Sequence, residues 1–431
     1  MNSSDQINRQ SIIPTFDSVG VLRKLIDTHK WAHIKLFHGS SSFSKYPFHA
    51  DLEKLLREAK VESYTVKPSD LNVETISKIV RQAKTKHWDA VVAIGGGSVI
   101  DMAKIISFLV RRDVSIEAYL KCSARNVDIP KQTILGASVG RSNDKASGAF
   151  RSKRFAVENV SKSTLSVSSE EIIWPFIAIP TTFGTGSEST QFATFYRNQQ
   201  KQSMDHPSLM PSIAILDSHW TTHLKGITFS SVLMDAFVQA IESYWSANAT
   251  DESLYFATQA ILAFAFFFEN EDCLNPSIQQ RMALLLGSNA SGRAIQLTKT
   301  TACHALSYPM TAHFGVPHGI AVFLTMPGLF HFILKANDPK KLRSNIDSDQ
   351  FSQRVSALKT LLGFKTPEDA QTYFVNLANK LKINRSLRSY GIDEKHLSLF
   401  VQDAFAVSSR MGNYPYQLEQ EDVYKILKDA L

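Results

Sequence analysis

Cysteine is scarce in this sequence of 431 residues. The three cysteines, Cys122, Cys273 and Cys303, are widely spaced and form neither a CxxC pair nor an even-numbered set. Their spacing excludes a small disulfide-stapled fold and the closely spaced thiol pairs of a structural zinc site. Such cysteine usage fits a reducing compartment, so we expect the protein to be cytoplasmic.

Long hydrophobic runs are also missing. The most apolar stretch, Ala260 to Phe268, is about half as long as a membrane-spanning helix needs to be. The N-terminal residues lack a basic region followed by an apolar core, so we expect no signal peptide. These absences predict a soluble protein without a membrane partner, in which residues 260–268 form part of a buried helix.

Acidic residues are fewer than basic ones, and the positive surplus is local. The formal net charge is +7, and residues 131–170 hold seven basic residues against three acidic ones. Few aromatic residues accompany them and no nucleic-acid motif is present, so we expect a solvated basic loop and no nucleic-acid partner. The same segment holds nine serines without a period, which predicts an excursion from the fold that is either disordered or a lid.

The length predicts two domains, and the hydrophobic pattern differs between them. Short apolar strands alternate with amphipathic helices at first, which is typical of a doubly wound parallel sheet. Beyond about residue 216, helical periodicity dominates. The predicted fold is therefore α/β plus all-α, with an α/β domain over 1–183 and a helical domain over 184–431. Strands are expected at 32–37, 63–66, 89–94 and 174–180, and helices at 51–59, 73–85, 231–245, 251–269, 278–297, 351–362, 367–382, 394–407 and 420–431.

A glycine-rich turn follows the apolar strand at 89–94. Gly95, Gly96, Gly97 and Ser98 end this strand and open a helix. Glycines let a diphosphate approach the backbone closely, and the free N–H groups at the start of a helix attract an anion. Glycines at such a turn are often only structural, but the flanking strand and helix favour phosphate binding.

A second small-residue turn, from Pro180 to Glu188, follows the strand at 174–180 and is rich in hydroxyl groups. By itself it is consistent with an ordinary turn. However, two turns at the carboxyl ends of parallel strands flank one crevice, which is where open α/β sheets bind ligands.

Four polar residues in the second half are candidate metal ligands. Asp235 and Gln239 lie four residues apart in an apolar helical segment, so they share one helix face. His304 and His318 are separated by two prolines and a glycine, which places them on separate elements. Taken alone, two such histidines are more often core or surface residues than metal ligands. Together with a carboxylate they predict an Asp/His/His site with open coordination positions, as in catalytic metal centres.

Four segments together resemble the iron-containing (group III) alcohol dehydrogenases. In chain order they are GGGSVIDMAK, PTTFGTGSE, MDAFVQAIE and HALSYPMTAHFGVPHG, and the resemblance covers about residues 15–425. It implies that the first domain binds NAD(P)H, that the second holds a divalent metal (Fe²⁺ or Zn²⁺), and that the substrate is a small aldehyde or alcohol. It also implies a homodimer.

The resemblance assigns site residues by position. The implied cofactor-binding residues are Gly95, Gly96, Gly97, Ser98, Asp101, Thr181, Thr182, Thr185, Ser187 and Lys201. The implied metal ligands are Asp235, His304 and His318, with Gln239 where the family usually has a histidine. Tyr308 stands where many members carry a proton-relaying histidine, so the proton would come from the phenol, a water chain or the cofactor ribose. An amide oxygen is a weaker and harder donor than imidazole, so we expect lower metal affinity or altered metal selectivity.

The neighbourhood of His304 resembles the phosphonate-metabolism branch of the family, which reduces phosphonoacetaldehyde to 2-hydroxyethylphosphonate. The segments that carry this likeness are QAIESYW, KTTACHALSYP and DHPSL. Lys299 and Thr300 offer a cation and a hydroxyl to a phosphonate, although Lys299 is equally consistent with a surface lysine. Two alternatives stay open: a general alcohol dehydrogenase acting on uncharged substrates, and a degenerate nucleotide-binding protein.

One position bears on the choice between NADH and NADPH. Many NAD-preferring enzymes place an acidic residue after an early strand of the sheet, where it binds the ribose 2′-hydroxyl. In this sequence we expect Gly39 and Ser40 to contact the cofactor there, followed by two more serines. Nothing acidic repels a 2′-phosphate, so NADP is permitted.

Overall fold

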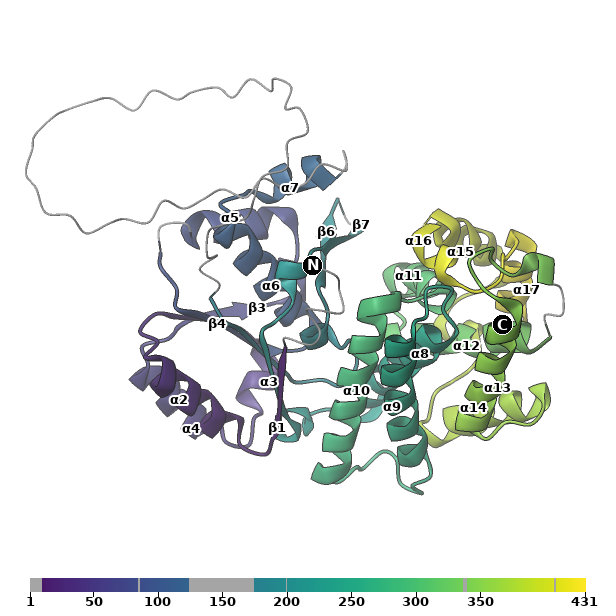
Figure 1. The fold of residues 1–431 in the computed structure, drawn as a ribbon, viewed down its shortest axis with the longest axis horizontal. Coiled ribbons are helices and arrows are strands. Elements are labelled where there is room, and N and C mark those ends of the chain that lie inside the picture. The colour runs from purple at the N-terminus through teal and green to yellow at the C-terminus, as the bar shows by residue number, and fades with distance from the viewer. Residues whose placement is uncertain (1–9, 84–85, 124–173, 199, 336–338, 407) are drawn as a thin grey trace, which may run out of the picture.

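The computed structural model describes residues 10–83, 86–123, 174–198, 200–335, 339–406 and 408–431 (Figure 1). Six parallel strands form one sheet in the order β1-β8-β5-β4-β2-β3. Helices flank this sheet and a helical domain follows it, which confirms the predicted fold class. The strands are β1 (Ser11–Thr15), β2 (Ile34–Gly39), β3 (Glu62–Val66), β4 (Ala90–Gly95), β5 (Phe176–Pro180) and β8 (Ile213–Asp217). The expected excursion at 131–170 lies outside the described residues.

Side-chain alternation along the strands builds two hydrophobic cores, one on each face of the sheet. On β4, Val91 and Ala93 pack in the core shared with α5, α6 and α7, whereas Val92 and Ile94 pack with α2 and α4. Both faces are buried, which explains why the strand reads as a continuous apolar run. The helices are α2 (Ser18–His29), α3 (Ser40–Ser44), α4 (His49–Glu58), η1 (Pro68–Asp70), α5 (Val73–Ala83), α6 (Gly97–Arg111) and α7 (Ile116–Ser123).

The α/β domain extends beyond the boundary expected at residue 183. β8 pairs with both β1 and β5, because a central strand needs neighbours on both sides for its backbone hydrogen bonds. Between β5 and β8 the chain forms an antiparallel hairpin, β6 (Phe192–Arg197) and β7 (Gln200–Asp205). The domain boundary therefore lies after Asp217 rather than at 183. Three short 3₁₀ turns accompany this region: η2 (Ser187–Ser189), η3 (Pro207–Leu209) and η4 (Ser218–Thr221).

The second domain is helical throughout its described part and packs around α8 (Gly226–Trp245), which is buried along nearly its whole length. Two further helices matter for the site, α11 (Ala302–Phe314) and α12 (His318–Lys335). The remaining elements are α9 (Asp251–Phe268), α10 (Ile278–Thr298), η5 (Pro339–Lys341), α13 (Ser348–Leu362), α14 (Pro367–Lys380), η6 (Leu387–Tyr390), α15 (Glu394–Ala406), α16 (Ser408–Asn413) and α17 (Gln420–Asp429).

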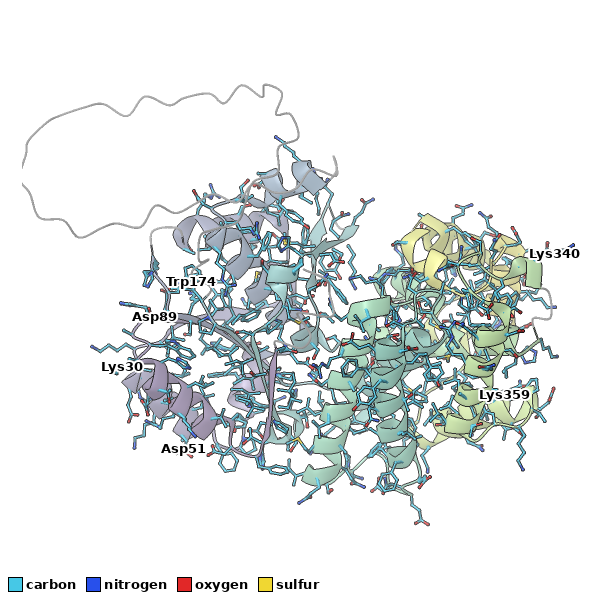
Figure 2. All side chains as sticks on the ribbon, in the orientation of Figure 1. Lys30, Asp51, Asp89, Trp174, Lys340 and Lys359 are labelled. Atoms are coloured by element: carbon cyan, nitrogen blue, oxygen red, sulfur yellow. The ribbon has the colours of Figure 1, made fainter. Side chains whose placement is uncertain are left out.

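Helix α12 has the length and apolar composition of a membrane-spanning helix. In this structure 61% of it is buried against other elements, as in the core helix of a globular domain. Its neighbour α11 continues through Pro309 and ends at Gly315, which adopts the left-handed conformation that glycine tolerates best. Side chains fill the interior of both domains, while Lys30 and Asp51 lie on the surface (Figure 2).

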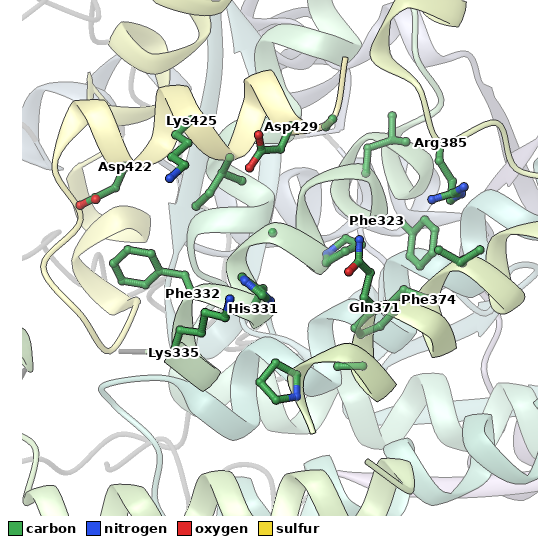
Figure 3. A pocket seen from close by; sticks show the side chains of 18 residues that line it. Phe323, His331, Phe332, Lys335, Gln371, Phe374, Arg385, Asp422, Lys425 and Asp429 are labelled. Carbon is green, nitrogen blue, oxygen red and sulfur yellow. The ribbon is translucent and has the colours of Figure 1, made fainter. Parts of the chain in front are cut away.

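A cavity of about 590 Å³ opens between α12, α14 and α17 (Figure 3). Aromatic side chains such as Phe374 and His331 and charged side chains such as Lys425 line it. None of the site residues expected from the sequence lines this cavity.

Candidate metal and cofactor site

Helix α8 carries two carboxylates and an amide along one face of a mostly apolar helix. Asp235, Gln239 and Glu242 follow at intervals of four and three residues, so all three point the same way. Their exposed fractions are only 4%, 4% and 0%. Burying two carboxylates and an amide is costly unless each finds partners, so this face needs a polar or metallic counterpart.

Helices α11 and α12 supply that counterpart as two imidazoles. The Nε2 atom of His304 lies 3.2 Å from Oδ1 of Asp235, and Nε2 of His318 lies 4.0 Å from the same oxygen. One donor atom from each residue lies within 4.8 Å of the others. The structure thus brings together the three metal ligands implied by the resemblance.

Gln239 lies in the same cluster and completes the donor set. Its Nε2 donates to Oδ1 of Asp235 at 3.0 Å, while its buried Oε1 has no hydrogen-bond partner among the described residues. An orphaned amide oxygen beside a carboxylate and two imidazoles is what an oxygen- and nitrogen-preferring divalent ion would use. The residues present therefore fit a bound Fe²⁺ or Zn²⁺.

Glu242 orients His304, a role that the sequence analysis did not predict. The Glu242 carboxylate contacts Nδ1 of His304 and accepts hydrogen bonds from the Thr301 hydroxyl at 2.6 Å and the Cys303 backbone N–H at 2.8 Å. A carboxylate on the far nitrogen of a ligating histidine fixes its ring and raises its basicity. The available signal was an acidic residue seven positions after Asp235 in an apolar helix.

The protonation states of the two histidines differ. Burial lowers the pKa of His304, but the carboxylates of Glu242 and Asp235 outweigh burial and raise it to about 9. Burial lowers the pKa of His318 to about 3, despite the attraction of Asp235. The His318 ring is therefore neutral and ready to donate a lone pair, whereas His304 must release a proton when a metal binds.

We expect Glu242→Gln to weaken metal binding about 10- to 100-fold, because His304 loses its orienting carboxylate. In the metal-free protein, the same change removes the main charge that raises the pKa of His304, so that pKa should fall below about 9. Zinc competition against a chromogenic chelator and an NMR titration measure the two effects. Glu368→Gln, at an exposed glutamate of α14, is the control. Unchanged affinity in Glu242→Gln would contradict this role.

The two glycine-rich turns meet at the carboxyl edge of the sheet. The Thr185 side chain packs so closely on the first turn that a Cβ atom on Gly97 would lie 2.8 Å from it. Gly39, at the end of β2, would likewise meet Val99 of the first turn at 3.6 Å. The turns at β2, β4 and β5 therefore border one region, as the sequence predicts for a dinucleotide site.

The expected cofactor residues divide by exposure. Ser40, Ser98 and Thr185 are exposed, and Gly39, Gly96, Gly97 and Thr182 are partly so, which leaves them available to a ligand. Gly95, Asp101, Thr181 and Ser187 are buried.

Asp101 joins the two turns from within. Its carboxylate accepts hydrogen bonds from the Ser187 hydroxyl at 2.6 Å and from the Thr194 backbone and hydroxyl at 2.9 and 2.8 Å. With its acceptor oxygens occupied in this way, Asp101 positions the second turn and β6 against α6 instead of reaching outward.

The second turn also packs directly on the helical domain. A Cβ atom on Gly186 would lie 2.5 Å from the Cα atom of Gly292 on α10, and one on Gly184 would lie 3.1 Å from Val232 on α8. Asn289 of α10 donates to the buried Glu188 carboxylate at 3.1 Å. These contacts hold the cofactor turn against the two helices beside the metal ligands.

Tyr308 lies between the metal cluster and two positive charges. Its ring is nearly parallel to that of His318, with centroids 6.2 Å apart. The Lys201 ammonium lies 4.8 Å from the Tyr308 ring centroid and the Arg410 guanidinium 5.2 Å from it. Burial raises the pKa of the Tyr308 phenol, but these two cations outweigh burial and lower it. Arg410 was missed by the sequence analysis because no local motif surrounds it.

Lys299 and Thr300 have different surroundings. Lys299 forms an ion pair with Asp205 at 2.6 Å and lies over the ring of Phe192, so its charge is already balanced. Thr300 is buried, and its hydroxyl accepts a hydrogen bond from Arg410. Lys299 therefore links the β6–β7 hairpin to the helical domain, while Thr300 fixes the Arg410 guanidinium.

Comparison with known proteins places this geometry in a family. Residues 11–137 and 145–218 match the model of the iron-containing alcohol dehydrogenases, and residues 230–431 match the model of the C-terminal part of the Fe-containing alcohol dehydrogenase family. The chain is 29% identical over 261 residues to a phosphonoacetaldehyde reductase from Streptomyces viridochromogenes, which is 60% of this chain and 57% of that protein. It is 24% identical over 374 residues to a long-chain-alcohol dehydrogenase from Geobacillus thermodenitrificans, which is 86% of this chain and 82% of that protein.

Solved structures share the whole fold. The crystal structure of a sulfoacetaldehyde reductase from Bifidobacterium kashiwanohense in complex with NAD⁺ superposes with a TM-score of 0.74 at 19% identity, over 98% of this chain and 97% of that one. The matched models span both domains, and the structure places Asp235, His304 and His318 within 4.8 Å of one another. This chain therefore belongs to the iron-containing alcohol dehydrogenase family and is an NAD(P)- and metal-dependent oxidoreductase of small aldehydes and alcohols.

Proposed function

We propose that the protein reduces phosphonoacetaldehyde to 2-hydroxyethylphosphonate with NAD(P)H. The similarity to a phosphonoacetaldehyde reductase supports this choice of substrate, as does the positive charge of Lys201 and Arg410 beside the metal cluster. The carbonyl reduction itself follows from the family.

The donor cluster of Asp235, His304 and His318 is the observation that carries the proposal. A divalent metal held by these three residues would act as a Lewis acid on the aldehyde oxygen, and the unpartnered Gln239 oxygen is a further donor that it could use. Asp235 and His304 are buried while the His318 ring is partly exposed, so the site opens on the His318 side, and Glu242 keeps His304 in a single orientation.

Two other parts of the chain serve the reaction. The exposed Ser98 and Thr185 and the partly exposed Gly96, Gly97 and Thr182 bind the cofactor diphosphate at the start of α6. The Tyr308 phenol, whose pKa the neighbouring cations lower, donates the proton that converts the reduced oxygen to an alcohol.

Both nicotinamide cofactors are compatible with the end of β2. Gly39 and Ser40 begin the short helix α3 there, and no carboxylate stands among residues 38–44. An enzyme without this acidic side chain does not repel the 2′-phosphate of NADPH.

A second candidate is the reduction of uncharged aldehydes. The match to a long-chain-alcohol dehydrogenase, which covers more of this chain than the phosphonate relative does, favours it.

Cofactor oxidation by the purified protein tests the proposal. The protein is stripped with a chelator, reloaded with Fe²⁺ or Zn²⁺, and supplied with NADH or NADPH and either phosphonoacetaldehyde or propanal. We expect metal-dependent turnover with a clear preference for phosphonoacetaldehyde. Faster turnover of propanal would assign the enzyme to uncharged substrates instead.

A further inference from the structure

Two cationic side chains beside the donor cluster of Asp235, His304 and His318 have no carboxylate partner in the part of the chain that the structure describes. They are Lys201, on β7 of the α/β domain, and Arg410, on α16 near the C-terminal end of the sequence. Both lie against the same Tyr308 ring, which stacks over the metal ligand His318. Segments more than 200 residues apart thus place two positive charges next to one reacting centre.

The Arg410 guanidinium is held in a fixed orientation. It donates to the buried Thr300 hydroxyl and lies over the face of Tyr308, so two contacts restrain it. Asn413, one turn further along α16, donates to the carbonyl oxygen of Thr300 at 3.1 Å and ties this helix to the start of α11. An oriented guanidinium with donors to spare binds tetrahedral oxyanions better than a mobile ammonium does.

The neighbouring Lys299 is a useful contrast. Its ammonium lies 2.6 Å from the Asp205 carboxylate, so a substrate anion would have to compete with that carboxylate for it. Of the three cations near the start of α11, the two on Tyr308 are therefore the ones free to meet an anion.

We propose that Arg410, assisted by Lys201, binds the anionic group of the substrate and selects aldehydes that carry a doubly charged phosphonate; this inference rests on the proposed function. The resemblance implied a cofactor contact for Lys201, and the position of its ammonium over Tyr308 is the reason for assigning it to the substrate side instead. Two unbalanced positive charges match a group of charge about −2, as a phosphonate or phosphate ester carries near neutral pH. A sulfonate carries a single charge and matches the pair less well. Arg410 is thus a specificity-determining residue, brought to the metal site by the C-terminal helices.

Two measurements on Arg410→Met test the proposal. In the metal-loaded enzyme, kcat/KM for phosphonoacetaldehyde should fall about 10- to 100-fold, mainly through KM, because a charge-assisted hydrogen bond is lost. The value for propanal, which is affected only through the higher pKa of the Tyr308 phenol, should fall much less, and KM for NADPH should stay within about twofold. Calorimetry with 2-hydroxyethylphosphonate, which needs no turnover, should show a similar loss of affinity. Compared with Arg410→Met, the Arg410→Lys variant should recover part of the kcat/KM for phosphonoacetaldehyde and part of the affinity for 2-hydroxyethylphosphonate.

Arg388→Met removes an arginine that pairs with Asp393 on the surface and is the matched control. Equal losses of kcat/KM for propanal and phosphonoacetaldehyde in Arg410→Met would show that Arg410 has only a structural role and would overturn the proposal. A loss of phosphonoacetaldehyde reduction in Lys299→Gln but not in Arg410→Met would also overturn it. Equal affinity of the wild-type protein for 2-hydroxyethanesulfonate and 2-hydroxyethylphosphonate would contradict the charge match. If the wild type reduced no aldehyde, the proposed function would fail, and calorimetry on Arg410→Met would still decide the anion site.

Discussion

Asp235→Ala should lower kcat/KM for every aldehyde by at least about a thousandfold, or about 4 kcal/mol. Asp235 is the one negatively charged member of the donor cluster, and both histidines and Gln239 face its Oδ1 atom. Without it, two imidazoles and a neutral amide remain, which is a poor set for a divalent ion. Metal content by mass spectrometry and single-substrate kinetics with added Fe²⁺ or Zn²⁺ measure the effect.

Folding must be checked separately, because Asp235 is buried. Removal of a buried carboxylate leaves His304 without one partner, so melting temperatures should be compared in the presence of a chelator. Asp349→Ala, at an exposed acidic position in the first turn of α13, is the control and should change activity little. A folded Asp235→Ala variant with full activity would falsify the metal-assisted mechanism.

Gly319→Ala should separate two helices that carry metal ligands. Gly319 follows His318 directly, and a Cβ atom there would lie 1.8 Å from the carbonyl oxygen of Ser231 and 2.8 Å from the backbone nitrogen of Asp235, both on α8. Backbone atoms cannot rotate away, so α12 must shift by more than about 1 Å to reach normal contact. We expect a loss of about 3 kcal/mol in the free energy of unfolding, together with loss of bound metal.

Gly328→Ala, in the same helix, is the matched control. Its Cβ would lie 2.6 Å from Cγ2 of Ile426, a side chain that can rotate, so the free energy of unfolding should change by about 1 kcal/mol or less. Denaturant unfolding of the metal-free proteins measures both variants without any contribution from the ion. Similar free energies of unfolding for the two variants would show that α8 and α12 can move apart at a lower cost than their close backbone contact indicates.

The fold and the donor cluster were predictable because their signals are local. The apolar strand before Gly95 predicted a buried parallel sheet, and Asp235 and Gln239 were recognisable as polar residues in a mostly apolar helical segment. The two prolines near His304 and His318 obscured the helices there. α11 continues through Pro309, because a proline within a helix costs a hydrogen bond but does not always end it.

Tertiary contacts decided the remainder. The domain boundary expected at 183 was wrong, because β8 joins the sheet by pairing with β5 and with β1, which lies some 200 residues earlier in the chain. Arg410 reaches Tyr308 from more than 100 residues away, and Lys299 finds Asp205 across the two domains. No motif or period marks such partners, so only the packed structure assigns them.

The contact between Gly186 and Gly292 has a consequence for how this enzyme can change. Two backbones touch there with no side chain between them, one on the turn from Pro180 to Glu188 and one on α10 of the helical domain. Any larger residue at either position would force this turn and α10 apart. We therefore expect single substitutions there to disturb the spacing between the two domains rather than to adjust it in small steps. Substitutions around Tyr308, on α16 and the β6–β7 hairpin, leave this contact intact, which makes these two segments the better targets for directed evolution toward new substrates.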